Sequence, residues 1–301
     1  MKKLSDLKTY KRWRRRITPA INLFYFLRNS LYKRLGSDIV LAFWYQEKNF
    51  GDLLTPDIFR FYGLVPLFTP NFDTCEAIVV GSILEVIPES YSGVILGSGF
   101  INEVTEKRFT QAKILLVRGR LTANKLSLPV SIPIGDPGIL VDQVYGDAIK
   151  DVGKKYKLGI VPHYKHINEK AIQKIINRYP NDILVIDVRR NPLEVIRDIA
   201  TCNCIASSSL HGIVVSHSLG IPVYPLEFDT NLRGGQFKFF DYYSVYGVEP
   251  VFYKLSGYER LEELCEFAIP IDLQVVASVK DNVNSVFNNY KTLVYQWYTK
   301  K

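Results

Sequence analysis

A short run of residues, Ser207-Ser208-Ser209-Leu210-His211-Gly212, combines side chains that bind anions with one that transfers protons. It follows an apolar segment typical of a strand and opens a pattern typical of a helix. Free backbone N–H groups in the first turn of a helix, aided by hydroxyls, bind anions. We therefore predict that Ser207, Ser208 and Ser209 bind an anion and that His211 is a catalytic acid or base. A helix cap beside a structural histidine explains the run equally well.

Basic side chains stand where two further apolar runs end, at Arg118, Arg120, His163 and Lys165. The planar guanidinium of arginine matches carboxylate and phosphate groups, and lysine supplies a point charge. Because the carboxyl ends of parallel strands meet at one edge, we expect these side chains to bind the same anion as the serines. His163 and His166 have a spacing that suits metal ligands, but no third ligand is near, so we predict no metal site.

Small and polar residues follow the strands expected in the first half of the chain: Asn49, Gly51, Asp52, Gly81, Ser82, Gly97 and Ser98. Amide and carboxylate groups exchange hydrogen bonds with a polyol, and glycines let a ligand approach the backbone closely. We predict that these residues bind a hydroxylated ligand. Asp52 as a helix cap and Gly51 as a turn residue explain the same pattern equally well.

The elements that must position these residues follow an alternation of apolar runs and amphipathic stretches. In the first half we expect strands at 39–44, 77–80, 94–96 and 114–117, with helices at 52–62 and 119–126. In the second half we expect strands at 158–161, 183–186, 204–206 and 223–225, with helices at 168–179, 192–200 and 210–219. This alternation predicts parallel sheets, hence an α/β fold with two Rossmann-like domains and a ligand cleft between them.

The domain boundaries follow from composition. A polar stretch at 147–157 is the expected linker, so the first domain is placed at 37–150 and the second at 151–301, with a closing helix over 273–298. Residues 1–36 hold eleven Lys or Arg and one Asp, so this segment carries a net charge of +10, while the whole chain carries +8 and the rest is therefore near neutral. A near-neutral body argues against a nucleic-acid partner.

The basic segment, residues 1–36, is also amphipathic. Its apolar residues are interleaved with arginine and lysine, as in helices that lie on an anionic membrane surface. A helix packed on the first domain with a solvated basic flank is the alternative. Its apolar run over 17–27 is too short to span a bilayer and lacks a signal-peptide cleavage site. The four cysteines have no disulfide or zinc spacing, which favours a cytoplasmic protein.

Several motifs occur in a characteristic order over residues 38–245: NFGD, VRGR, GDPG, VPHY, SSSLHG and LGIP. In this order the chain resembles the polysaccharide pyruvyltransferase family. The resemblance implies a GT-B-like arrangement of the two domains and transfer of a pyruvyl group from phosphoenolpyruvate to a sugar, which forms a ketal and releases phosphate. It implies that His211 is the catalytic acid and that Arg118 holds the anionic donor. Many members carry arginine where this chain has Ser209, so another basic residue would replace it.

From the resemblance we expect the first domain to bind the acceptor and the second to bind the donor. Phosphoenolpyruvate would be a co-substrate, with no cofactor, and the acceptor would be a sugar of a lipid-linked polysaccharide precursor. We expect the basic segment to attach the protein to the inner face of the cytoplasmic membrane. Two alternatives remain open: a GT-B-type glycosyltransferase that uses a nucleotide sugar, and a non-catalytic sugar-binding subunit of a polysaccharide assembly complex.

Overall fold

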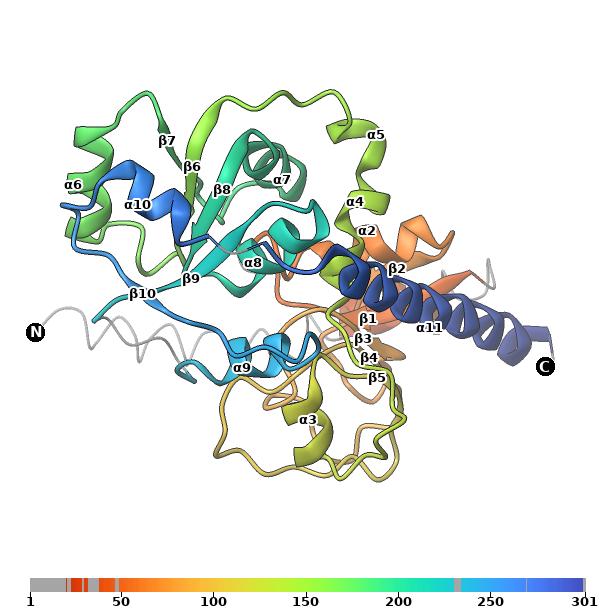
Figure 1. Ribbon diagram of the computed structural model, residues 1–301. Helices are drawn as coiled ribbons and strands as arrows, with labels where there is room; N and C mark the ends of the chain where they lie inside the picture. Colours follow the sequence, from red (N-terminus) through yellow and green to blue (C-terminus); the bar gives the residue numbers. More distant parts are fainter. Residues whose placement is uncertain are drawn as a thin grey trace, which may run out of the picture.

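Two five-stranded parallel sheets form the centre of the protein (Figure 1). The computed structural model describes residues 38–46, 49–229, 234–268 and 270–299, together with residues 20, 23–28 and 30–31 of the N-terminal segment. The α/β class predicted from the alternation of apolar runs is confirmed, as are two parallel sheets consistent with Rossmann-like domains.

The first sheet has the strand order β2-β1-β3-β4-β5, all parallel. Its strands are β1 Ile39–Phe43, β2 Val65–Phe68, β3 Ala77–Ile78, β4 Val94–Leu96 and β5 Lys113–Leu116. Helices α2 Leu54–Phe61 and α3 Arg120–Lys125 follow β1 and β5. Helix α2 buries Leu54 and Ile58 on one face, as their i, i+4 spacing requires. Strand β2 lies on one side of β1, and β3, β4 and β5 follow on its other side. The order in which strands are added to the sheet therefore reverses between β1 and β3.

The second sheet has the order β10-β9-β8-β6-β7, again all parallel. Its strands are β6 Tyr156–Val161, β7 Ile183–Val185, β8 Cys202–Ser207, β9 Val223–Glu227 and β10 Tyr253–Lys254. The helices of this half are α6 Lys170–Arg178, α7 Pro192–Ala200, α8 Leu210–Ser218 and α10 Leu261–Glu266. Counted from its first strand, this sheet has the same order as the first one. Its reversal lies between β6 and β8.

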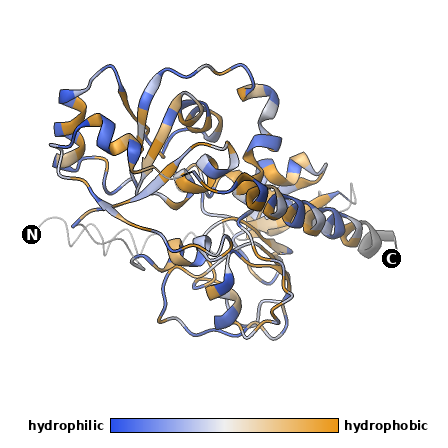
Figure 2. Cartoon of the chain, viewed as in Figure 1, coloured by the Kyte–Doolittle hydropathy of each residue, from blue (hydrophilic) through white to orange (hydrophobic). Residues whose placement is uncertain are grey.

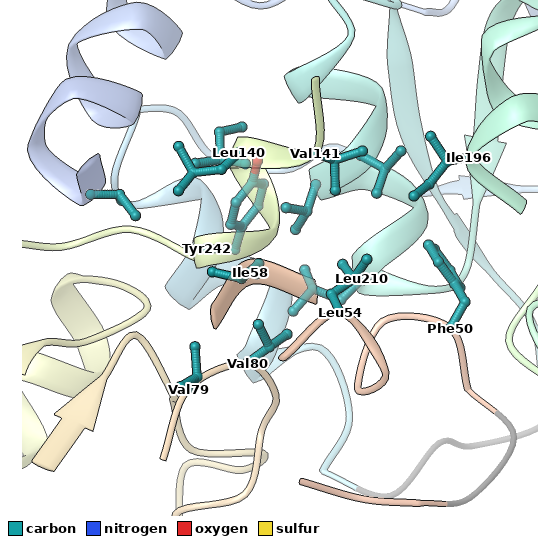
Figure 3. Packing of buried hydrophobic residues seen from close by; sticks show 14 of the residues in the cluster. Phe50, Leu54, Ile58, Val79, Val80, Leu140, Val141, Ile196, Leu210 and Tyr242 are labelled. Carbon is teal, nitrogen blue, oxygen red and sulfur yellow. The ribbon is translucent and has the colours of Figure 1, made fainter. Parts of the chain in front are cut away.

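Both halves contribute to one hydrophobic core (Figure 3). Leu54 of the first half and Leu210 of the second belong to the same cluster, with Leu140 of the connecting segment. That segment consists of the short helices η1 Pro137–Leu140, α4 Val141–Val144 and α5 Gly146–Ile149. Helices α8 and η1 are in contact, so the second half packs directly on the connection.

The long C-terminal helix α11, Leu273–Thr299, returns to the first half. Its Phe287 stacks on Tyr62 with ring centroids 5.0 Å apart, and its Lys280 pairs with Asp142 at 2.7 Å. Figure 2 shows apolar and polar residues alternating along α11, as expected for a helix with one buried face.

The predicted elements agree with the structure except in detail. Strand β3 ends at Ile78, two residues before its predicted end, and the predicted linker 147–157 contains the end of α5 and the start of β6. Strands β2 and β10 and helices α10 and α9, Phe237–Tyr243, were not predicted. Strand β2 is short and contains a proline, and strand β10 has two residues. Helix α9 is a run of aromatic residues without clear periodicity.

Most of the predicted basic segment lies outside the described residues. Within it, residues 23–28 are helical and touch the first sheet. The Tyr25 ring meets Phe68 at 5.3 Å, and Arg28 Nη2 donates to the Phe68 carbonyl at 3.2 Å. Leu23, Phe24 and Leu27 are exposed. No helix in the part of the chain that the structure describes is long and apolar enough to cross a membrane.

Candidate active site

The two reversals in strand order supply residues to one cavity of about 470 Å³. In open α/β sheets, ligands bind beyond the carboxyl ends of the strands at such reversals. Segments after β1 and β3 contribute from the first half, and segments after β6 and β8 from the second. Seven predicted site residues line this cavity: Asn49, Asp52, Ser82, His163, Lys165, Ser209 and His211.

His211 lies in the first turn of α8 and is buried in the cavity wall. Its Nε2 stands 3.9 Å from Asp136 Oδ2, too far for a hydrogen bond, and neither atom has a hydrogen-bond partner in the described part of the chain. Burial lowers the pKa of His211, an effect that the nearby Asp136 carboxylate opposes. The imidazole is therefore neutral near pH 7.

A glycine fixes the place of this imidazole. Any Cβ on Gly51 would collide with the His211 ring, so only glycine lets the segment after β1 approach α8 this closely. Phe50 meets the same ring edge-on, with centroids 6.4 Å apart. The Phe50 N–H donates to the Val188 carbonyl at 2.8 Å, which ties this segment of the first half to the second half.

Of the three serines, only Ser209 faces the cavity. The Ser207 hydroxyl lies 2.9 Å from the Val161 carbonyl and accepts from the Ser209 N–H at 3.1 Å. The Ser208 hydroxyl accepts from the His163 N–H at 3.0 Å and lies 2.9 Å from His166 Nδ1. Ser207 and Ser208 thus join the end of β8 to the end of β6.

Asn49 and Asp52 form a polar pair on the opposite wall. Asn49 Nδ2 donates to Asp52 Oδ2 at 2.8 Å. Helix α2 begins at Leu54 without a side-chain cap, so Asp52 does not cap it. A paired amide and carboxylate on the cavity wall are suited to binding sugar hydroxyls.

The structure does not bring Arg118 into the cavity. Its side chain is fully buried, and Nε donates to Asp241 Oδ2 at 2.9 Å. Nη2 lies 2.8 Å from the same carboxylate and donates to the Phe100 carbonyl at 2.5 Å, while Nη1 donates to Ser82 Oγ. All three guanidinium nitrogens are therefore engaged within the protein.

The remaining predicted residues also lie outside the cavity lining. Arg120 donates its N–H to Ser244 Oγ at 2.8 Å and its Nη1 to the Val130 carbonyl at 3.0 Å. Ser98 Oγ donates to the Gly81 carbonyl at 2.7 Å, which joins the ends of β3 and β4. Gly97 packs against Pro137 with a φ of +106°, a conformation that favours glycine. These contacts are structural.

Lys238 lines the cavity and was not predicted. It is carried by α9, only 8% of its surface is exposed, and burial lowers the pKa of its ammonium to about 8. The nearby Arg118 lowers this pKa further, while Asp52 opposes the shift. The sequence offered no signal for Lys238, because it does not follow a predicted strand.

The described residues contain no group of three or more His, Cys, Asp or Glu side chains suited to a metal ion. His163 and His166 lie with ring centroids 5.9 Å apart, and burial lowers the pKa of His163 to about 3. The cavity therefore holds neutral histidines next to one buried ammonium.

The sequence matches a known protein family. Residues 3–230 match the family described as "Polysaccharide pyruvyl transferase". This match covers most of the chain, so the protein belongs to the polysaccharide pyruvyltransferase family, and the resemblance drawn from the order of its motifs is confirmed.

Two curated relatives are similar to the chain. The uncharacterized protein L143 of Acanthamoeba polyphaga mimivirus is 34% identical over an alignment of 235 residues that covers 70% of this chain and 79% of the relative. The succinoglycan biosynthesis protein ExoV of Rhizobium meliloti is 28% identical over 185 residues, 59% of this chain and 55% of ExoV.

Proposed function

We propose that the protein transfers a pyruvyl group from phosphoenolpyruvate to two hydroxyls of a sugar in a polysaccharide precursor, forming a ketal and releasing phosphate. One observation carries the proposal: a single cavity holds a buried histidine, a buried ammonium and a polar pair suited to a sugar, namely His211, Lys238 and Asn49 with Asp52. Family membership and the similarity to a succinoglycan biosynthesis protein support it.

In the proposed reaction, His211 donates a proton, directly or through water, to the methylene carbon of phosphoenolpyruvate. Because burial lowers the pKa of His211, its protonation requires a nearby anion, and the donor's own charge supplies one. A sugar hydroxyl attacks C2 and loses its proton as the new C–O bond forms. The C2–O bond to phosphate then breaks, and a second hydroxyl adds to C2. One of the two hydroxyl protons restores His211, and the other leaves on phosphate.

In this proposal one side of the cavity binds the acceptor and the other side binds the donor. Asn49 and Asp52 of the first half orient the acceptor sugar. Ser209 and the N–H groups at the start of α8, with Lys165 at the rim, face the donor. A cavity lined by residues of both α/β halves supports the proposal of a GT-B-like arrangement.

The test is a His211→Asn variant assayed for phosphate release from phosphoenolpyruvate with a polysaccharide-precursor acceptor. Loss of general acid catalysis predicts that turnover falls at least about 100-fold, while donor binding is retained. His217→Asn is a matched control, because His217 is a buried histidine on the same helix that stacks on Tyr242 outside this cavity. Wild-type turnover in His211→Asn, or binding of a nucleoside diphosphate in place of phosphoenolpyruvate, would contradict the proposal.

We also propose that the N-terminal segment attaches the protein to the anionic inner face of the cytoplasmic membrane, where a lipid-linked acceptor would be presented. Exposed Leu23, Phe24 and Leu27 supply apolar contact, and eleven basic residues within residues 1–36 supply charge. Each basic residue contributes about 1 kcal/mol near such a surface.

The attachment is tested by sedimenting the full chain with phosphatidylserine or phosphatidylcholine vesicles. Binding should require the anionic lipid and should fall at least fivefold in a Phe24→Ser/Leu27→Ser variant. Val104→Ser/Val130→Ser is the control, since these valines are apolar, more exposed than Phe24 and Leu27, and lie elsewhere in the chain. Equal binding by both variants would refute a membrane role for the segment.

A further inference from the structure

Helix α9 belongs to the second half of the chain but is fixed to the first half by a buried ion pair. Asp241 Oδ2 accepts from Arg118 Nε at 2.9 Å, and both side chains are fully buried. The same carboxylate accepts from the Thr122 N–H and hydroxyl, each at 2.7 Å. The Ser244 hydroxyl at the end of the helix accepts from the Arg120 N–H at 2.8 Å. Four hydrogen bonds therefore set the position of α9 against α3.

Lys238 stands three residues before Asp241, on the same side of α9. While Asp241 faces Arg118, Lys238 reaches the cavity wall beside Asp52 and His211. Its side chain is more than nine-tenths buried. Among the described residues, no hydrogen bond or ion pair satisfies its Nζ, and the contact observed there is with the ring of Phe239, 5.3 Å away.

The Lys238 side chain has lost most of its contact with water, and the nearby Asp52 carboxylate opposes the resulting fall in pKa without forming an ion pair with the ammonium. The lowered pKa of Lys238, due first to burial and then to Arg118, reflects this environment. An anionic ligand in the cavity would supply the missing partner. A phosphate or carboxylate group has the charge to do so.

We propose that Lys238 binds the anionic donor and that Arg118 acts through Asp241 to position Lys238. This inference rests on the proposed function. Lys238 is thus a donor-binding residue, and Arg118 and Asp241 are positioning residues.

The first experiment titrates the full chain with phosphoenolpyruvate by calorimetry near pH 7. Lys238→Ala should weaken binding at least tenfold, and Lys238→Arg should stay within about threefold of wild type because it keeps the charge. Lys254→Ala, an exposed lysine paired with Asp229, should match wild type. Unchanged binding by Lys238→Ala would overturn the inference and leave the proposed function intact. No binding by wild type would overturn the proposed function itself.

The second experiment repeats the titration from pH 7 to pH 9.5, above the range in which the donor phosphate titrates. Lys238 must be protonated to bind an anion, so wild-type affinity should fall about tenfold by pH 9 for a pKa of about 8. The charged and titratable groups facing Lys238 are Asp52, Arg118, His163 and His211. In the free protein both histidines have lowered pKa values and are neutral throughout this range, and guanidinium groups stay charged. Because the donor favours protonation of His211, the comparison with Lys238→Arg is made in the His211→Asn background, so that the fall in affinity reports on residue 238. The fall should vanish in Lys238→Arg, and its persistence there would refute the inference.

The positioning role is tested with Asp241→Asn, which keeps the shape of the side chain and removes its charge. Release of α9 would expose Lys238 to water, so its pKa would rise toward the ordinary value and the fall in affinity would move to higher pH. A purely structural role would lower stability without moving this pH dependence. An unshifted pH dependence in a folded Asp241→Asn variant would therefore overturn the positioning role.

Discussion

Replacing Asp241 with alanine should destabilise the protein more than almost any other single change on α9. The substitution leaves the Arg118 guanidinium buried, with Ser82 Oγ and the Phe100 carbonyl as its remaining hydrogen-bond partners among the described residues, and it also removes the acceptor of the Thr122 N–H. Breaking a buried ion pair by removing one partner costs about 3–5 kcal/mol. For a chain of this size that corresponds to a fall in melting temperature of roughly 5–8 °C.

The assay is thermal and urea unfolding of Asp241→Ala, Arg118→Met and the double variant. The cost comes mainly from the charge that each single substitution leaves unpaired. The loss of unfolding free energy in the double variant should therefore be smaller than the sum of the two single losses, by about 2 kcal/mol or more. Asp229→Ala serves as the control, since it removes an exposed ion pair with Lys254 and should change stability by less than about 1 kcal/mol. A loss below about 1 kcal/mol in Asp241→Ala, or strictly additive losses, would refute this account of the ion pair.

Two further substitutions test contacts around the cavity. Gly51→Ala should displace the His211 ring and lower turnover at least 100-fold, measured by phosphate release. Phosphoenolpyruvate should still bind, measured by calorimetry. Undiminished turnover would show that this contact does not hold the ring. Ser208→Ala removes the acceptor of the His163 N–H and the partner of His166, so urea unfolding should show a loss of about 1–2 kcal/mol, and an unchanged midpoint would contradict the assigned role.

Periodicity in the sequence was sufficient to predict most of the fold. Helix α7 has the predicted bounds, because Asn191 caps it and Pro192 occupies its first turn, and both signals are local. Strand β2 was missed because it is short and contains Pro66, which is unusual inside a sheet. Helix α9 was missed because its aromatic residues pack on several neighbours and show no single apolar face.

The site was predictable where a residue directly follows a strand. Asn49 and His211 share one cavity because the carboxyl ends of parallel strands meet at one edge of each sheet. The partner of Arg118 was not predictable, since Asp241 lies 123 residues further along the chain and only the folded protein brings them together. The same reason applies to Lys238, which reaches the cavity from a helix outside the strand alternation.

Because both sheets have the same strand order, acceptor specificity and donor specificity can change independently under the proposed function. The segment after β1 and the segment after β6 occupy equivalent places in the two sheets, as do those after β3 and β8. Under the proposed division of substrates, one copy of this unit recognises the acceptor and the other the donor. Mutations in the first copy can then select a new sugar while the donor chemistry of the second stays intact. Chimeras exchanged at the connecting segment would offer a route to new pyruvylated glycans, provided that the α9 ion pair is carried over with both halves.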